Sequence, residues 1–126
     1  MINRRPYIAQ SEIAPGSAVI QGTVDNAVTA PADEKADVLG VYPFEANDAA
    51  AAQDRIGIAL GGVVKVVAGG TASAGKKAVL SKTKLGAFED VPATAGTYKT
   101  CGIFLESGVA GEYIDMYIER GVITVA

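Results

Sequence analysis

The chain has 126 residues, of which 49% are apolar, and it contains 15 Gly, 5 Pro, no Trp and no His. This length suits one domain with a single core, and many glycines are typical of short elements joined by tight turns. The net charge of −3 argues against direct binding of nucleic acid, which needs a basic surface, and no apolar run is long enough to form a transmembrane helix.

The first fifteen residues are polar and irregular, and Pro6 and Pro15 bracket them. We therefore expect an extended N-terminal arm over residues 1–15, followed by one β-domain over residues 16–126. The arm lacks the apolar segment of a secretory signal. It also lacks enough apolar surface to fold alone, so it is either a frayed terminus or a segment that binds a partner. Arg4, Arg5 and Tyr7 would be its anchors on an acidic or carbonyl-rich surface.

Residues 17–55 begin with strand-like sequence and then change character. Strands are expected at "AVIQGTV" (18–24), in the segment that continues from Asp25, and at "VLGVYPF" (38–44). The next segment, "EANDAAAAQDR" (45–55), has helical propensity, and Asn47 or Asp48 would cap it. It predicts one short helix, which at two or three turns must lean on a sheet. The role of the alanine-rich insertion at residues 46–53 stays open.

The remaining sequence reads as a series of short strands. "RIGIALG" and "GVVKVVAGG" are separated by a glycine pair, and a strand ends near Val79 before a tight turn at Gly86 and a strand back. "TYKTCGIFLES", "GEYIDMYIE" and "GVITVA" complete the series. About nine short strands with regularly spaced turns predict an all-β fold, either a sandwich or a small barrel.

Two parts of the chain resemble each other. "LGVYPFEANDAAAAQDRIGIALGGVVKV" aligns with "CGIFLESGVAGEYIDMYIERGVITV". The matched residues are Gly40 with Gly102, Val41 with Ile103, Tyr42 with Phe104, and Gly62-Val63-Val64 with Gly121-Val122-Ile123. One interpretation is an internal duplication in which two copies build the halves of one barrel. The other is that strand–turn–strand sequences share composition without common origin.

Residues for catalysis or metal binding are scarce. The absence of His removes the usual general base and the commonest metal ligand. The one cysteine, Cys101, lies in an alternating apolar stretch and is expected to be a small buried thiol. "GTASAGKK" (70–77) approaches a phosphate-binding loop, but Lys77 stands where Ser or Thr is needed and a strand follows. We therefore expect no enzyme activity, no catalytic residue, no metal and no cofactor.

The strand near the end of the chain divides into two faces. Ile114, Met116 and Ile118 alternate with Tyr113, Asp115, Tyr117 and Glu119. The first set is expected in the core. Tyr113, Asp115 and Tyr117 would face outward and form either a protein-binding surface, since tyrosines are enriched at interfaces, or an ordinary half-exposed sheet face.

The sequence resembles the capsid cement (decoration) proteins of tailed bacteriophages. The resemblance rests on "VVKVVAGGTASAGKKAVLSKTKLGAFEDV" and "YKTCGIFLESGVAGEYIDMYI" and covers about residues 55–118. The positions that carry it are Gly69-Gly70, Ala74-Gly75, Val79, Gly86, Gly102, Leu105, Gly108, Ala110, Gly111 and Glu112. The alanine-rich insertion departs from the tightest form of this pattern.

The resemblance implies a structural protein of the virion. Such proteins are small β-barrels or β-tulips that form homotrimers on the outer surface of the head, after synthesis in the host cytoplasm. They bind the major capsid protein where neighbouring subunits meet and stabilise the shell against internal DNA pressure, with no direct contact to nucleic acid or membrane. The alternatives are another phage structural β-module, of a tail or baseplate, and a carbohydrate-binding module.

Overall fold

The computed structural model describes residues 3–44 and 48–126, and this part of the chain forms an all-β fold. Its strands are β1 (Asn3–Ala9), β2 (Ala18–Gln21), β3 (Ala27–Thr29), β4 (Gly40–Val41), β5 (Arg55–Val67), β6 (Lys77–Leu80), β7 (Phe88–Asp90), β8 (Gly96–Phe104) and β9 (Tyr113–Val125). The predicted small all-β barrel is confirmed. No helix in the described ranges is long and apolar enough to cross a membrane.

The first five strands close into a barrel. They follow the order β1-β3-β2-β4-β5, and β5 pairs back onto β1. β1 and β5 are antiparallel from Arg4 opposite Ala59 to Ile8 opposite Arg55, whereas β1 and β3 are parallel. The barrel interior is one apolar cluster, which consists of Tyr7, Ala9, Ile13, Val19, Val28, Tyr42, Ala50, Ile56 and Ile58.

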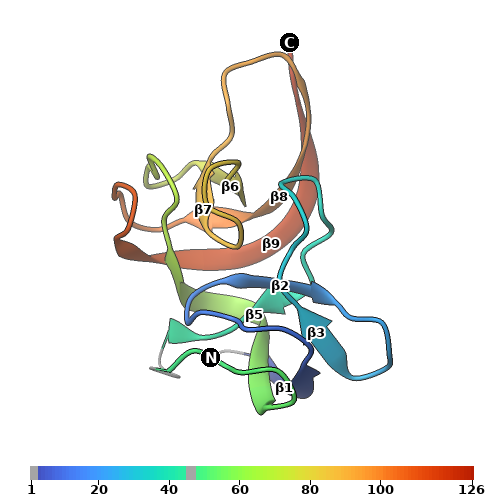
Figure 1. The fold of residues 1–126 in the computed structure, drawn as a ribbon. Helices are drawn as coiled ribbons and strands as arrows, with labels where there is room; N and C mark the ends of the chain where they lie inside the picture. The colour runs from blue at the N-terminus through green and yellow to red at the C-terminus, as the bar shows by residue number, and fades with distance from the viewer. Residues whose placement is uncertain (1–2, 45–47) are drawn as a thin grey trace.

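The long strand β5 connects this barrel to a second sheet. Residues 55–61 belong to the barrel, and residues 62–67 pair with β9, which continues the sheet in the order β5-β9-β8-β6-β7. Gly62 has a φ of 81° at the junction. Figure 1 shows the two units stacked, with the first barrel below, β6–β9 above, and the C-terminal end of the chain at the top. Phe88, Phe104 and Met116 are fully buried in the second core.

The segment expected to be an arm is instead a strand of the first barrel. β1 pairs with both β3 and β5, and the side chains of Tyr7, Ala9 and Ile13 are buried. Residues 3–15 therefore need no partner to be ordered, because the rest of this chain supplies their hydrogen bonds and covers their apolar side chains. The prediction of an extended arm was wrong for these residues.

The alanine-rich segment does not form the predicted helix in its described part. Residues 48–54 form a turn in which the Asp54 carboxylate accepts a hydrogen bond from the Ala51 amide at 2.8 Å. Ala50 pairs with Ile13 as an isolated bridge, and its side chain is buried. The proposed cap Asn47 lies outside the described residues, whereas Asp48 is described and begins no helix. Tertiary pairing here overrides the helical propensity of alanine.

The strand pairings show that the two units repeat one topology, which agrees with the duplication interpretation. β2 pairs with β3 and β4 in the first unit, and β6 pairs with β7 and β8 in the second, all antiparallel. The pairing of β4 with β5 in the first unit corresponds to the pairing of β8 with β9 in the second. Likewise, the pairing of β1 with the first half of β5 corresponds to the pairing of the second half of β5 with β9. Even the parallel contact of β1 with β3 recurs, as the bridge between Ala68 and Phe88.

The turns repeat the same hydrogen bonds. The Gly16 amide donates to the Tyr42 carbonyl at 2.7 Å, and the Gly75 amide donates to the Phe104 carbonyl at 2.7 Å. Both glycines have positive φ, 80° and 84°. Tyr42 and Phe104 are a pair that the sequence alignment had matched, so the alignment reflects structure rather than composition.

The duplication also corrects two details of the sequence interpretation. Residues 48–54 correspond to residues 106–112, because the Glu112 carboxylate accepts from the Val109 amide at 2.8 Å as Asp54 does from Ala51. The alanines are thus an ordinary part of the repeat, and the extra residues of the first copy fall between Tyr42 and Asp48. The two copies also do not form the halves of one barrel. Each copy forms a unit of its own, which includes one half of β5.

Candidate protein-interaction surface

The outer face of β9 carries the residues expected there. Tyr113 and Tyr117 are 42% and 44% exposed, and Asp115 between them is half-buried. Ile114 and Met116 point the other way and are buried in the second core. The period of two along this strand therefore assigned both faces correctly.

Tyr117 lies in a row of side chains that crosses four strands. Val63 of β5 is directly opposite it on one side and Ile103 of β8 on the other, and Lys77 of β6 is opposite Ile103. Val63 is 41% exposed and Ile103 is half-buried. We call Val63, Ile103 and Tyr117 the apolar row. It offers a small exposed apolar area with an aromatic centre, which is the arrangement found at the middle of protein interfaces.

Charged side chains of both signs flank the apolar row. Lys65 lies opposite Asp115, with its Nζ 3.2 Å from Oδ1, and it also approaches Glu106 at 3.8 Å. Lys77 reaches Glu119 at 3.7 Å. These ion pairs are half-exposed and contribute little to stability. A fixed pattern of charges of this kind favours a surface of complementary charge.

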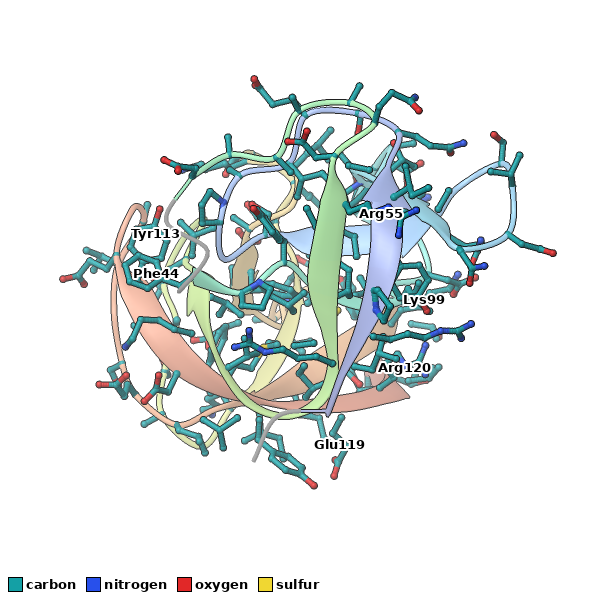
Figure 2. All side chains as sticks on the ribbon, turned by 90° about the horizontal axis from the view of Figure 1, so that it is seen from below. Phe44, Arg55, Lys99, Tyr113, Glu119 and Arg120 are labelled. Atoms are coloured by element: carbon teal, nitrogen blue, oxygen red, sulfur yellow. The ribbon has the colours of Figure 1, made fainter. Side chains whose placement is uncertain are left out.

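Tyr113 packs against residues of the first unit within the same chain. Its ring packs against Phe44 with a centroid distance of 4.4 Å and an interplanar angle of 50°, and Figure 2 shows the two rings side by side. Its edge also lies over Gly16, where an added Cβ would stand 3.1 Å from the Tyr113 Cε1. Tyr113 therefore holds the first repeat's turn against β9, and Tyr117 is the more available of the two tyrosines.

The three N-terminal candidates do not form one exposed anchor. Tyr7 is 5% exposed, so it is part of the first core and unavailable to a partner. Arg5 is exposed, donates to the Asn26 Oδ1 at 3.1 Å and lies 5.4 Å from the centroid of the Tyr7 ring. Arg4 is exposed and pairs with Ala59 of β5, four positions before Val63 of the apolar row.

Cys101 is buried, as expected from its apolar surroundings. It is 4% exposed in the second core. Burial raises the pKa of the Cys101 thiol to about 12, and the nearby positive charge of Arg120 only partly opposes this. A thiol with so high a pKa is a poor nucleophile, because the thiolate is the reactive form.

We expect Cys101 to resist modification in the folded protein. With an aromatic disulfide reagent at mildly alkaline pH, native protein should release almost no coloured thiolate, whereas protein in denaturant should react within the mixing time. A rapid, complete reaction of the native protein would contradict the buried environment described for this side chain.

Val63, Lys65, Ile103 and Glu106 also belong to this surface, although no local pattern in the sequence indicates them. Cross-strand pairing brings Val63, Lys65 and Ile103 beside Asp115 or Tyr117. The Glu106 carboxylate accepts a hydrogen bond from the Asp115 amide at 2.8 Å. Within the described ranges no group of three His, Cys, Asp or Glu side chains is placed to hold a metal ion. What the surface offers chemically is area and charge for a macromolecular partner.

Comparison with known proteins supports this fold assignment. The structure is similar to a crystal structure described as the head fiber gp8.5 N base in bacteriophage phi29, with a TM-score of 0.65 and 16% sequence identity. The similarity covers 98% of this chain and 98% of that chain. The two proteins therefore share a fold along their whole compared length. No family model matches the sequence, and no curated protein matches it.

Proposed function

We propose that this protein is a structural component of a bacteriophage head, bound to the outer surface of the shell. The observation that carries the proposal is the fold shared, end to end, with the base of a phage head fiber. The resemblance of residues 55–118 to capsid cement proteins points to the same part of the virion through the sequence.

The proposed mechanism is non-covalent stabilisation by interface area. The protein binds the major capsid protein where neighbouring subunits meet and holds the expanded shell against the pressure of packaged DNA. It does so as a homotrimer and without enzyme activity. A standard protein interface buries about 1,600 Å² in total, and simultaneous engagement by three linked subunits multiplies weak contacts through avidity.

The apolar row and its flanking charges are the surface proposed to face the capsid. Tyr117 is its centre because the ring is exposed, is flanked by Val63 and Ile103, and loses little conformational entropy on binding. Asp115 and Lys65 lie beside it and set the orientation of the partner. Tyr113 supports this surface from the Phe44 side.

A second candidate function is the anchoring of a fiber. The similar phi29 structure is described as the base of a head fiber, which favours a protein that carries another element outward without strengthening the shell. The two candidates differ in one measurable consequence. A stabilising protein raises the temperature at which heads release DNA, whereas an anchor binds heads and leaves that temperature unchanged.

Replacement of Tyr117 by Ala is the mutation expected to separate binding from folding. The free energy of unfolding should change by less than about 1 kcal/mol because the ring is half-exposed, while the affinity for expanded heads should fall at least tenfold, as at a central interface residue. The measurement is co-sedimentation with purified heads over a range of protein concentrations. Val109→Ala is the matched control, since Val109 is 61% exposed and lies outside the row.

Two results would count against the proposed surface. One is unchanged head affinity of the Tyr117→Ala protein, which would place the capsid contact elsewhere. The other is an equal loss with Val109→Ala, which would show that the assay reports general surface change. If the wild-type protein pellets with tails and not with heads, the proposed location on the head is wrong.

A further inference from the structure

The last part of β9 forms a two-stranded ribbon with the first part of β8. Residues 121–125 pair with residues 96–100, from Gly121 opposite Thr100 to Val125 opposite Gly96. We call these two segments the β8–β9 ribbon. Figure 1 shows it projecting away from the first barrel and from the rest of the second unit, with the C-terminal end of the chain at its tip. In the described part of the chain, residues 121–125 form ladder pairs with β8 only.

A projecting ribbon of this kind is marginally stable in isolation. Two strands without a third strand or a covering layer bury too little apolar surface. Here Val122 is 68% exposed, and Ile123 and Val125 are only half-buried. The segment "GVITVA" (121–126) contains no charged residue and no proline, the two features with which proteins commonly protect an exposed strand edge from pairing.

The repeat contains a second segment equivalent to residues 121–126, and the rest of the chain covers that segment. Residues 62–67 of β5 are the equivalent of residues 121–126, with Gly62 matching Gly121 and Val63 matching Val122. The inward residues Val64 and Val66 are 1% and 0% exposed, because β6–β9 of the second unit pack against this half of β5. Their counterparts Ile123 and Val125 have no such unit over them in the described ranges. The same half-strand is thus a buried junction in one copy and an open surface in the other.

We propose that the β8–β9 ribbon is a self-association surface, which packs against a second copy of this chain. The occupant is inferred from the repeat itself. Within one chain, the partner of this half-strand is another unit of the same fold, and a second copy supplies that unit. This inference deepens the homotrimer of the proposed function and rests on that part of it alone, not on head binding.

The composition of the ribbon agrees with contact between identical chains. Among residues 96–100 and 121–125 the one charged side chain is Lys99, and it is already paired with Asp37 at 2.7 Å. A second copy that packs against the ribbon therefore meets no unpaired charge on these ten residues. Arg120, at the base of the ribbon, donates to the Val38 carbonyl at 3.2 Å, and Figure 2 shows Lys99 and Arg120 close together at one edge of the molecule.

An open groove lies next to the ribbon and extends the available surface. Its volume is about 360 Å³, and its walls combine Val79, Leu80, Pro92 and Tyr98 with charged residues of both signs, which are Glu34, Lys35, Lys82, Glu89 and Lys99. Tyr98 is directly opposite Ile123 in the ribbon, so the groove and the ribbon share this side chain. A second copy that covers the ribbon can therefore also bury part of the groove.

The test is the oligomeric state of the full chain with two substitutions on the face of the ribbon that carries Ile123 and Val125. Ile123→Asp and Val125→Asp each place a charge where a second copy would exclude water, and burial of an unpaired charge is costly. Sedimentation velocity over a wide concentration range should show an oligomer for the wild-type protein and at least tenfold weaker association for both variants. Val109→Asp is the control, because Val109 is 61% exposed and lies in a turn outside the ribbon.

Each outcome bears on the proposal. A wild-type protein that is monomeric at all concentrations overturns it, and so does association that both ribbon variants leave unchanged. Equal weakening by Val109→Asp also overturns it, because the effect would then not belong to the ribbon. Thermal unfolding of each variant shows whether the first barrel and the second unit are intact. If the wild-type protein associates through the ribbon but does not bind heads, the proposed function fails while this inference stands.

Discussion

Removal of residues 1–10 is expected to abolish folding of the first barrel. β1 closes this barrel by pairing with β5 from Asn3 to Ile8, and Tyr7 and Ala9 fill part of its core. Without β1, the edges of β3 and β5 lose their partners and buried apolar side chains meet water. Because a domain is stable by only about 5–15 kcal/mol, the truncated chain should show no cooperative thermal transition from the first unit, as measured by circular dichroism.

Single substitutions in β1 provide the control for this truncation. Tyr7→Ala removes a buried aromatic ring and should cost about 3–5 kcal/mol. Ile8→Ala in the same strand should cost much less, since Ile8 is 38% exposed and points away from that core. A truncated protein with wild-type stability, or equal effects of Tyr7→Ala and Ile8→Ala, would contradict the placement of β1 in the barrel wall.

Alanine at Gly102 is expected to be strongly destabilising. A Cβ at this position would overlap the carbonyl oxygen of Tyr117 on β9 and stand 2.9 Å from the Met116 Cγ. The carbonyl belongs to a paired strand and cannot move without breaking the ladder, so the cost should reach or exceed about 1–3 kcal/mol. Urea unfolding measures this as a lower midpoint with an unchanged slope.

The duplication extends this prediction to Gly40 and supplies its control. A Cβ at Gly40 would overlap the Ala59 carbonyl oxygen and stand 2.7 Å from the Ile58 Cγ2, so Gly40→Ala should be destabilising for the same reason. Gly57 lies in β5 with nothing within 4 Å of an added Cβ, and Gly57→Ala should change the free energy of unfolding by less than about 0.5 kcal/mol. Similar effects at all three glycines would mean that the close strand contacts at Gly40 and Gly102 are absent.

The strands could be predicted from the sequence where alternation was clear. The inward and outward faces of β9 follow directly from the alternation of Ile114, Met116 and Ile118 with Tyr113, Asp115 and Tyr117. Two adjacent pairs of expected strands proved to be single long strands, β5 and β9, because a glycine pair in one and a bulge in the other bend the strand without ending it. Local signals cannot separate a bend from a turn.

The role of residues 3–9 could not be read from local sequence. Pro6 and two arginines argue against a strand interior, and nothing nearby in the chain reveals that β5, some fifty residues later, supplies the hydrogen-bond partners. The helix predicted for the alanine-rich segment was wrong for a related reason. Helix propensity depends on local sequence, whereas the bridge between Ala50 and Ile13 joins residues far apart in the chain. The apolar row could not be predicted without the register of strand pairing, because this register places Val63 and Ile103 beside Tyr117.

Electron cryo-microscopy of purified phage heads, with and without added protein, tests the central claim most directly. If the protein decorates the shell, mature heads incubated with it should show extra density on the outer surface, at the junctions between major capsid subunits. The two-unit fold described here should fit this density with the Tyr117 face toward the capsid. Identical maps with and without the protein, at concentrations far above those of the capsid sites, would contradict it.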